Sequence, residues 1–145
     1  MKTITKSFGE IEYTEDMIIR FNEGIPGFRE VKQYIIIEEA ESPLKYLQAI
    51  EQDITFIVID PYTLMRDYTI DIKDQYVKAL GGGTAEQFSV YVITTVVEDF
   101  ESATVNLIAP VIIQNKTRQG MQVILENTQY TTKHKIVDLL KEGDK

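Results

Sequence analysis

The sequence predicts a mainly antiparallel all-β fold, barrel-like or sandwich-like, of about ten short strands with one internal helix and a short C-terminal helix. Short runs rich in Val, Ile, Thr and aromatic residues recur along the 145-residue chain. Glycine, proline and acidic residues separate these runs. Strands and helices do not alternate regularly, which argues against a parallel sheet. We therefore expect a single β domain over residues 1–145.

The run SVYVITTVV, from Ser89 to Val97, is expected to be a central strand. Both of its alternating faces are apolar or β-branched, which is typical of a strand covered on each side. An acidic bend follows, then a strand ending at Ala109-Pro110. Pro110 has no N–H to donate, so we expect it at an edge, a bulge or a strand's first residue. A hairpin is expected next, with Gly120 adopting the positive φ that closes it.

Earlier strands are expected at residues 3–8, 10–13, 17–21, 33–38, 44–50 and 54–60. Two glycines and a proline punctuate the segment Phe21–Phe28, which indicates a loop with defined turns. Its apolar side chains have two interpretations. They pin the loop to the core, or they form an apolar docking surface.

The segment Asp71–Leu80 has the apolar spacing of a helix, with Asp71 as a plausible N-cap. The glycine run 81–83 ends it and lacks the context of a phosphate-binding loop. A terminal helix is expected after Thr131-Thr132, with Ile136, Leu139 and Leu140 on one face. That face either covers the domain's own core or binds a partner.

Composition narrows the class of protein. Fifteen Lys and Arg against 23 Asp and Glu give a formal charge of −8, which disfavours direct binding of nucleic acid and favours basic partners. The same charge is also what solubility alone would require. No apolar run is long enough to span a membrane, and the first residues do not resemble a secretory signal. The absence of cysteine agrees with the cytoplasmic location that we expect.

No catalytic or metal-binding constellation stands out. The single histidine, His134, lies between two lysines, which oppose a cation, so we expect an ordinary surface histidine. Acidic clusters at Glu38/Glu39/Glu41 and at Glu98/Asp99/Glu101 fall in turns, where solvated carboxylates are common. We expect no cofactor, no metal and no enzyme activity. The alternative is an acidic β-barrel enzyme or a small-ligand-binding domain of unknown substrate.

Arg118 lies at the tip of the expected hairpin. A guanidinium there either holds the protein's own carbonyl groups or meets a partner's carboxylate, and the sequence leaves both open.

Five motifs occur in a specific order along the chain: Phe21-x-x-Gly24-Ile25-Pro26-Gly27-Phe28, Leu47-Gln48, Phe56-x-Val58-x-Asp60-Pro61, Val105-Asn106-Leu107-x-Ala109-Pro110, and Asn115-x-x-Arg118-x-Gly120-x-Gln122. In this order and spacing they closely resemble the FliW flagellar assembly factor family. The resemblance covers essentially the whole chain.

The resemblance implies a cytoplasmic bacterial protein without catalytic activity. Members of that family bind flagellin, and alternatively bind the carbon storage regulator CsrA, a small dimeric RNA-binding protein that represses translation of flagellin mRNA. It therefore implies a partner switch, in which flagellin and CsrA occupy this protein in turn. We expect a monomer that contacts neither nucleic acid nor membrane directly.

The expected partner-binding residues combine this implication with side-chain chemistry. Ile25 and Phe28 are expected as apolar anchors for an amphipathic flagellin segment. Glu98, Asp99 and Glu101 are expected to attract basic CsrA. The polar or edge candidates are Asn106, Pro110 and Arg118, because an asparagine inside a strand has no packing rationale and an arginine pairs with carboxylates.

Overall fold

A computed structural model describes residues 1–5, 8–50, 52–126 and 128–143. The strands in these residues are β1 Lys2–Thr5, β2 Gly9–Glu12, β3 Ile19–Arg20, β4 Gln33–Glu38, β5 Leu44–Ala49, β6 Thr55–Ile59, β7 Phe88–Thr95, β8 Thr104–Val105, β9 Val111–Gln114, β10 Gln119–Gln122 and β11 His134–Lys135. The helices are α1 Asp74–Ala79 and α2 Ile136–Gly143, with short 3₁₀ turns at η1 Glu15–Met17, η2 Pro61–Thr63, η3 Ala85–Gln87 and η4 Phe100–Ser102.

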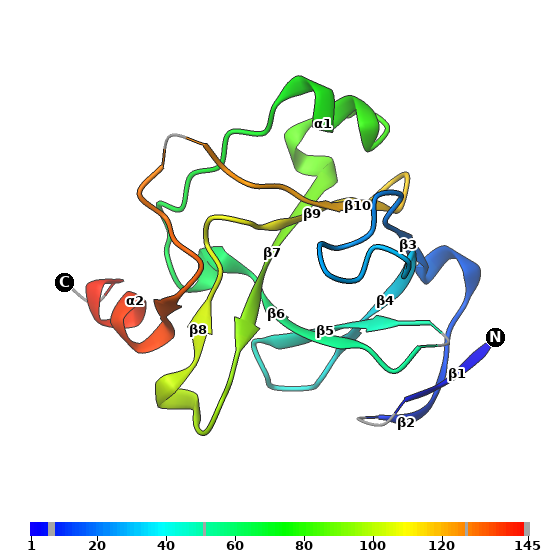
Figure 1. Cartoon of the computed structure of the whole chain (residues 1–145), viewed down its shortest axis with the longest axis horizontal. Coiled ribbons are helices and arrows are strands. Elements are labelled where there is room, and N and C mark those ends of the chain that lie inside the picture. The colour runs from blue at the N-terminus through cyan, green and yellow to red at the C-terminus, as the bar shows by residue number, and fades with distance from the viewer. Residues whose placement is uncertain (6–7, 51, 127, 144–145) are drawn as a thin grey trace.

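Seven strands close into a mixed barrel in the order β7-β6-β5-β4-β3-β10-β9, because β9 pairs again with β7. Every pairing in it is antiparallel except β10 with β3. The predicted all-β, mainly antiparallel class is confirmed, and the barrel is the correct alternative of the two. Figure 1 shows β7 running through the middle of the molecule, from α1 at one end to the β7–β8 connection at the other.

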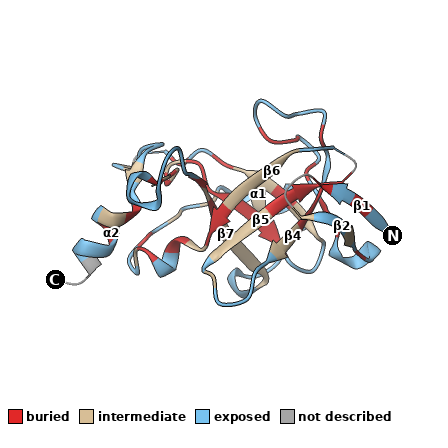
Figure 2. Ribbon diagram, turned by 90° about the horizontal axis from the view of Figure 1, so that it is seen from below, coloured by how far each residue is buried: buried red, intermediate tan, exposed pale blue. Residues whose placement is uncertain are grey.

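The two faces of β7 are buried in different clusters, as its sequence predicts. Tyr91 and Ile93 pack against the barrel interior, together with Phe21, Tyr34 and residues of the neighbouring strands. Val92 packs on the outside of the wall, in a cluster closed by the C-terminal segment and α2. In Figure 2 the buried residues accordingly follow the central strands, whereas α2 and β1–β2 carry exposed residues. This double coverage ends at Thr95, because Val96 and Val97 lie beyond the strand and are exposed.

The N-terminal hairpin β1–β2 forms a separate two-stranded sheet. It accompanies a small outer cluster of Tyr13, Ile18, Ile35 and Ile50. The hairpin was predicted correctly, but the strand expected at 17–21 is shorter, because η1 occupies Glu15–Met17. Residues 6 and 7, inside the first predicted strand, lie outside the described residues.

The expected strand through Ala109-Pro110 is wrong beyond Val105. The Asn106 side chain causes the break, because its Oδ1 accepts a hydrogen bond from the Ala109 N–H at 3.0 Å and turns the backbone. Pairing with β7 resumes at Val111, opposite Tyr91. Pro110 therefore stands just before a strand, one of the positions predicted for it.

The helix boundaries also differ from those predicted. α1 begins at Asp74, so its N-cap is Lys73 rather than Asp71. α2 begins at Ile136, because residues 134–135 form β11 against β8 instead of a first helical turn after Thr131-Thr132. Ile136 and Leu139 of the predicted apolar face are buried in the cluster that contains Val92, whereas Leu140 is exposed.

Candidate binding surfaces

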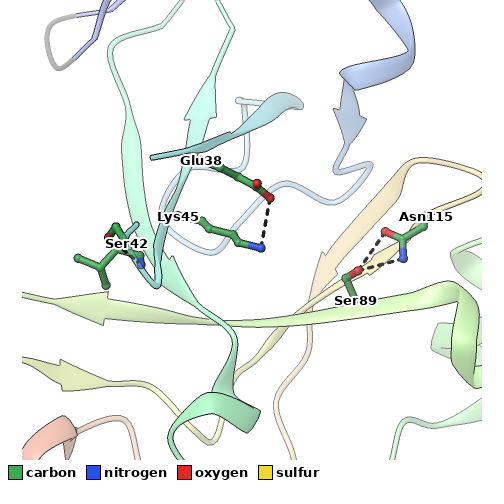
Figure 3. A network of polar contacts seen from close by, with 6 residues as sticks. Glu38, Ser42, Lys45, Ser89 and Asn115 are labelled. Carbon is green, nitrogen blue, oxygen red and sulfur yellow. Dashed lines mark hydrogen bonds and ion pairs between the residues drawn. The ribbon is translucent and has the colours of Figure 1, made fainter. Parts of the chain in front are cut away.

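The rim of the barrel carries a polar network rather than a catalytic site. Figure 3 shows Lys45 pointing to Glu38, with Nζ 3.2 Å from the carboxylate, and Asn115 paired with Ser89. Burial lowers the pKa of Lys45, but its hydrogen bond and charge pairing with Glu38 outweigh that effect and raise the pKa overall. The lysine therefore stays protonated and serves as a structural ion pair. No group of three or more His, Asp or Glu side chains among the described residues could hold a metal ion.

The loop from 21 to 32 folds onto the barrel interior. Phe21 is fully buried, its ring edge-on to Tyr34 with centroids 5.2 Å apart. Ile25 is only 2% exposed, so the expectation that it is an exposed anchor is wrong and its side chain belongs to the core. Phe28 is 36% exposed and packs edge-on against Phe56. The core interpretation of this loop therefore holds for Phe21 and Ile25.

The β7–β8 connection, residues 96–102, which we call the acidic tip, has the opposite character. Val97 is 78% exposed and Phe100 is 46% exposed. Glu98 and Glu101 are exposed, and neither carboxylate has an ion-pair partner in the described part of the chain. The Asp99 carboxylate already has a local partner, because it caps η4 by accepting a hydrogen bond from the Ser102 N–H at 3.0 Å. The three predicted acidic residues are thus brought together on one exposed tip.

Helix α2 extends the surface beside the acidic tip. Its start is tied to this region by the hydrogen bond from the Ile136 N–H to the Ala103 carbonyl, 3.1 Å long. Residues of α2 also contact η4. Figure 1 shows α2 beside the β7–β8 connection, and the exposed Leu140 of α2 lines a cavity together with residues 63–66.

The remaining predicted residues have structural roles. Asn106 forms the turn described above, and the Pro110 carbonyl accepts a hydrogen bond from the Val123 N–H at 3.0 Å. Arg118 donates from Nη2 to the Met17 carbonyl at 3.1 Å, which is the first of its two predicted alternatives. The asparagine is therefore not an unexplained polar residue within a strand.

The turn before β10 corrects one prediction about glycine. Arg118, with φ of 58°, has the left-handed conformation there, and Gly120 does not. Gly120 is needed for another reason, since a Cβ on it would lie 2.7 Å from the Phe21 ring. The glycine lets β10 pass close to the buried aromatic ring.

His134 is half-buried rather than fully at the surface, and its Nε2 accepts a hydrogen bond from the Thr131 N–H at 2.9 Å. Its ring also contacts Tyr130 edge-on. These contacts position β11 and give the histidine a structural role.

Two surfaces were missed by sequence reasoning. One is the apolar part of the acidic tip, Val97 and Phe100, for which the signal is an apolar pair running past the strand into a string of acids. The other is a cavity of about 430 Å³ between η2, α1, η3 and the start of β7. Eight residues line it: Tyr62, Ile70, Ile72, Val77, Gly83, Ala85, Phe88 and Val90. No local sequence pattern indicates that these residues converge.

These features define a closed β-barrel that presents exposed apolar and acidic surface. Within the described residues, no helix has both the length and the apolar character needed to cross a membrane.

The FliW protein family matches residues 2–136 of the chain. The flagellar assembly factor FliW of Thermoanaerobacter pseudethanolicus is 42% identical over 99% of this chain and 97% of its own length. That of Ruminiclostridium cellulolyticum is 40% identical over 97% of each chain. A crystal structure of the flagellar assembly factor FliW superposes with a TM-score of 0.88 at 39% identity, covering 94% of this chain and 96% of that one.

The chain therefore belongs to the FliW family of flagellar assembly factors, as the sequence motifs predict. This family is not enzymatic, so the alternative of an acidic β-barrel enzyme is wrong.

Proposed function

We propose that this protein is a cytoplasmic partner switch in flagellar assembly. It binds flagellin and, alternatively, the translational regulator CsrA. While it holds CsrA, flagellin mRNA is translated. When unsecreted flagellin accumulates and occupies the protein, CsrA is released and represses further synthesis.

The observation that carries the regulator half of this proposal is the acidic tip. It combines exposed apolar side chains, Val97 and Phe100, with the carboxylates of Glu98 and Glu101, which have no ion-pair partner among the described residues. Exposed aromatic and aliphatic side chains supply binding energy when an interface desolvates them. Carboxylates around them speed the encounter with a basic surface and disfavour acidic partners.

Charge also supplies a reason for the antagonism. The chain has a formal charge of −8, and a regulator that binds RNA presents positive charge. Negative charge docked beside an RNA-binding surface attracts the regulator and repels the phosphate backbone. Occupancy by this protein therefore weakens the regulator's hold on RNA, whether or not the two contacts overlap.

The flagellin half requires an apolar receptor surface, because an unassembled amphipathic segment that folds on binding needs somewhere to bury its apolar face. Phe28 is half-exposed beside Phe56 and remains a candidate contact. Ile25 supports that loop from within the core.

A gel-shift assay with flagellin leader RNA tests the proposed function. This protein alone should leave the RNA unshifted at physiological salt, because both are acidic. Added to a CsrA–RNA complex, it should release the RNA, and added flagellin should restore the complex. A shift of the RNA by this protein alone would count against the switch. So would a CsrA–RNA complex that this protein does not dissociate.

A further inference from the structure

A second surface lies at the opposite end of β7 from the acidic tip. It is the cavity of about 430 Å³ noted above, which we call the α1 pocket. Its lining includes Tyr62, Ile70, Ile72, Ala85, Phe88 and Val90. None of the lining residues carries a charge. A cavity with this lining accepts apolar side chains and offers nothing to a charged one.

The end of α1 and the glycine run that follows it, which leads into the lining residue Gly83, are held by Gln114 at the end of β9 and by Thr117 in the β9–β10 turn. The Gln114 side chain donates to the Gly82 carbonyl at 2.8 Å, and the Thr117 hydroxyl donates to the Leu80 carbonyl at 2.7 Å. A Cβ on Gly81 would lie 2.4 Å from the Thr117 side chain, so the glycine permits this close approach. These contacts fix the backbone that leads into Gly83, so this side of the pocket needs less ordering when a ligand binds.

Tyr62 also lines the pocket and is 41% exposed. Its backbone N–H donates to the Asp60 carboxylate at 2.9 Å, and its ring packs edge-on against Tyr68 at 5.8 Å. A tyrosine held in this way offers a large contact area at low cost in side-chain entropy, which is why tyrosine is enriched at binding hot spots.

The surroundings of the α1 pocket are acidic. Asp60 accepts a hydrogen bond from the Tyr62 N–H, and Glu86 follows Ala85 in η3, so both carboxylates lie beside lining residues. Asp71 and Asp74 lie close to lining residues in the sequence, as do the cations Lys73 and Lys78, and Lys45 lies near Asp60 but is paired with Glu38. Lys73 is already paired with Glu126, with Nζ 3.0 Å from the carboxylate. A partner segment that brings basic or neutral residues beside its apolar anchor is therefore favoured, and an acidic segment is excluded.

We propose that the α1 pocket is the docking site for an amphipathic helical segment of flagellin that inserts one or two large apolar side chains and places basic residues against the rim. This inference rests on the proposed function, which supplies flagellin as the partner. The lining comes from several chain segments and is apolar, and an amphipathic helix presents apolar anchors at i and i+3 or i+4 to a surface of this kind.

The location separates the two docking surfaces along the barrel. The pocket is lined by Phe88 and Val90 at the start of β7, and the acidic tip follows its last residue, Thr95. Eight extended residues span about 25 Å at roughly 3.3 Å each. A short flagellin helix in the pocket does not reach the tip, so exclusion of the regulator arises from the bulk of flagellin or through the barrel wall.

Filling the pocket tests the proposal. Ala85 is exposed in η3 and lines the cavity, so Ala85→Phe should place a ring where the anchor enters. Ala79→Phe is the matched control, because Ala79 is exposed on α1 outside the lining. Calorimetric titration with purified monomeric flagellin should show binding at least about tenfold weaker for Ala85→Phe and unchanged for Ala79→Phe. Tyr62→Ser, which removes a wall at a partly exposed position, should weaken flagellin binding as well.

Binding of CsrA by each variant, and its melting curve, complete the experiment. The proposal predicts that CsrA binding and melting temperature stay unchanged in Ala85→Phe. Equal flagellin affinity in Ala85→Phe, Tyr62→Ser and the wild type would overturn the pocket assignment and leave the proposed function standing. So would loss of flagellin binding in Phe28→Ala alone. Failure of the wild-type protein to bind flagellin at all would overturn both.

Discussion

The loop 21–32 and the acidic tip 96–102 both join strands, and both carry aromatic and acidic residues. They differ in whether their apolar side chains are buried. In the loop, Phe21 and Ile25 enter the barrel interior. On the tip, Val97 and Phe100 remain exposed. The difference follows from where each segment lies. Both segments contain local backbone hydrogen bonds, but the loop packs Phe21 and Ile25 into the barrel interior, whereas the tip projects beyond the last pair of its hairpin, Thr95 with Thr104.

This contrast shows where apolar residues are available for binding. Side chains that a compact loop turns inward contribute to stability, and their removal leaves a cavity. Side chains on a projecting tip contribute little to folding and are free to bind. The same residue type, phenylalanine, should therefore have different mutational consequences in the two places.

The largest expected effect is on the free energy of unfolding. Phe21→Ala should destabilise the protein by about 3–5 kcal/mol, because it empties a fully buried site. Phe100→Ala should cost less than about 1 kcal/mol, as exposed positions do. Urea unfolding of both variants measures this difference. A similar loss in both would mean that the acidic tip is as much a part of the core as the loop.

Gly24 and Gly27 differ in how closely the loop packs around them. A Cβ on Gly24 would lie 2.4 Å from the Arg29 Cα, and its φ is 68°. Gly27 has φ of 89° with nothing within 4 Å of such a Cβ. Gly27→Ala should cost about 1–2 kcal/mol from backbone strain alone. Gly24→Ala should cost about 1–3 kcal/mol more, because backbone must also move. Equal unfolding free energies for Gly24→Ala and Gly27→Ala would show that the loop is not closely packed around Gly24.

Alkaline pH should reveal the tyrosine buried beneath the loop. Burial, with a smaller contribution from the charge of Glu30, raises the pKa of Tyr34 to about 12 from 10.0. A raised folded-state pKa means that the stabilisation is complete below pH 10 and is lost as the pH rises toward 12. The free energy of unfolding should therefore fall over this range.

Tyr34→Phe is the control for the alkaline loss. It should reduce that loss, and because the Tyr34 hydroxyl is buried without a hydrogen-bond partner, the substitution should not destabilise the protein at neutral pH. Tyr68, whose pKa burial also raises, should account for part of the loss that remains. An unchanged alkaline loss in Tyr34→Phe would contradict the burial of this hydroxyl beneath the loop.

The fold was largely predictable because strand signals are local. The continuous apolar and β-branched run of β7 and the β-rich runs of β4 to β6 specify strands before any tertiary contact is known. The errors occur where a single side chain redirects the backbone. Asn106 ends β8 early by accepting a hydrogen bond from Ala109, and its residue type alone does not reveal that partner.

The candidate surfaces were less predictable, because exposure depends on residues distant in sequence. Ile25 was expected to be accessible, but its side chain is buried in the barrel interior. Glu98, Asp99 and Glu101 were expected in a turn, and they lie in one. Charged side chains are seldom buried, so a run of acidic residues after a strand favours an exposed turn. The α1 pocket needs η2, α1, η3 and β7 together, and only the folded chain supplies that combination.

The most direct test of the account is the rate at which CsrA associates with charge-reversed variants. Glu98→Lys/Glu101→Lys reverses two carboxylates of the acidic tip and spares the Asp99 cap. Glu23→Lys/Glu30→Lys makes the same change of charge on the exposed side of the loop. Stopped-flow measurements over a series of salt concentrations compare both with the wild type. Steering by the tip predicts association at least about tenfold slower, with a flatter salt dependence, for the tip variant only. An equal effect of both pairs would mean that net charge alone attracts the regulator, and would contradict the acidic tip as its docking surface.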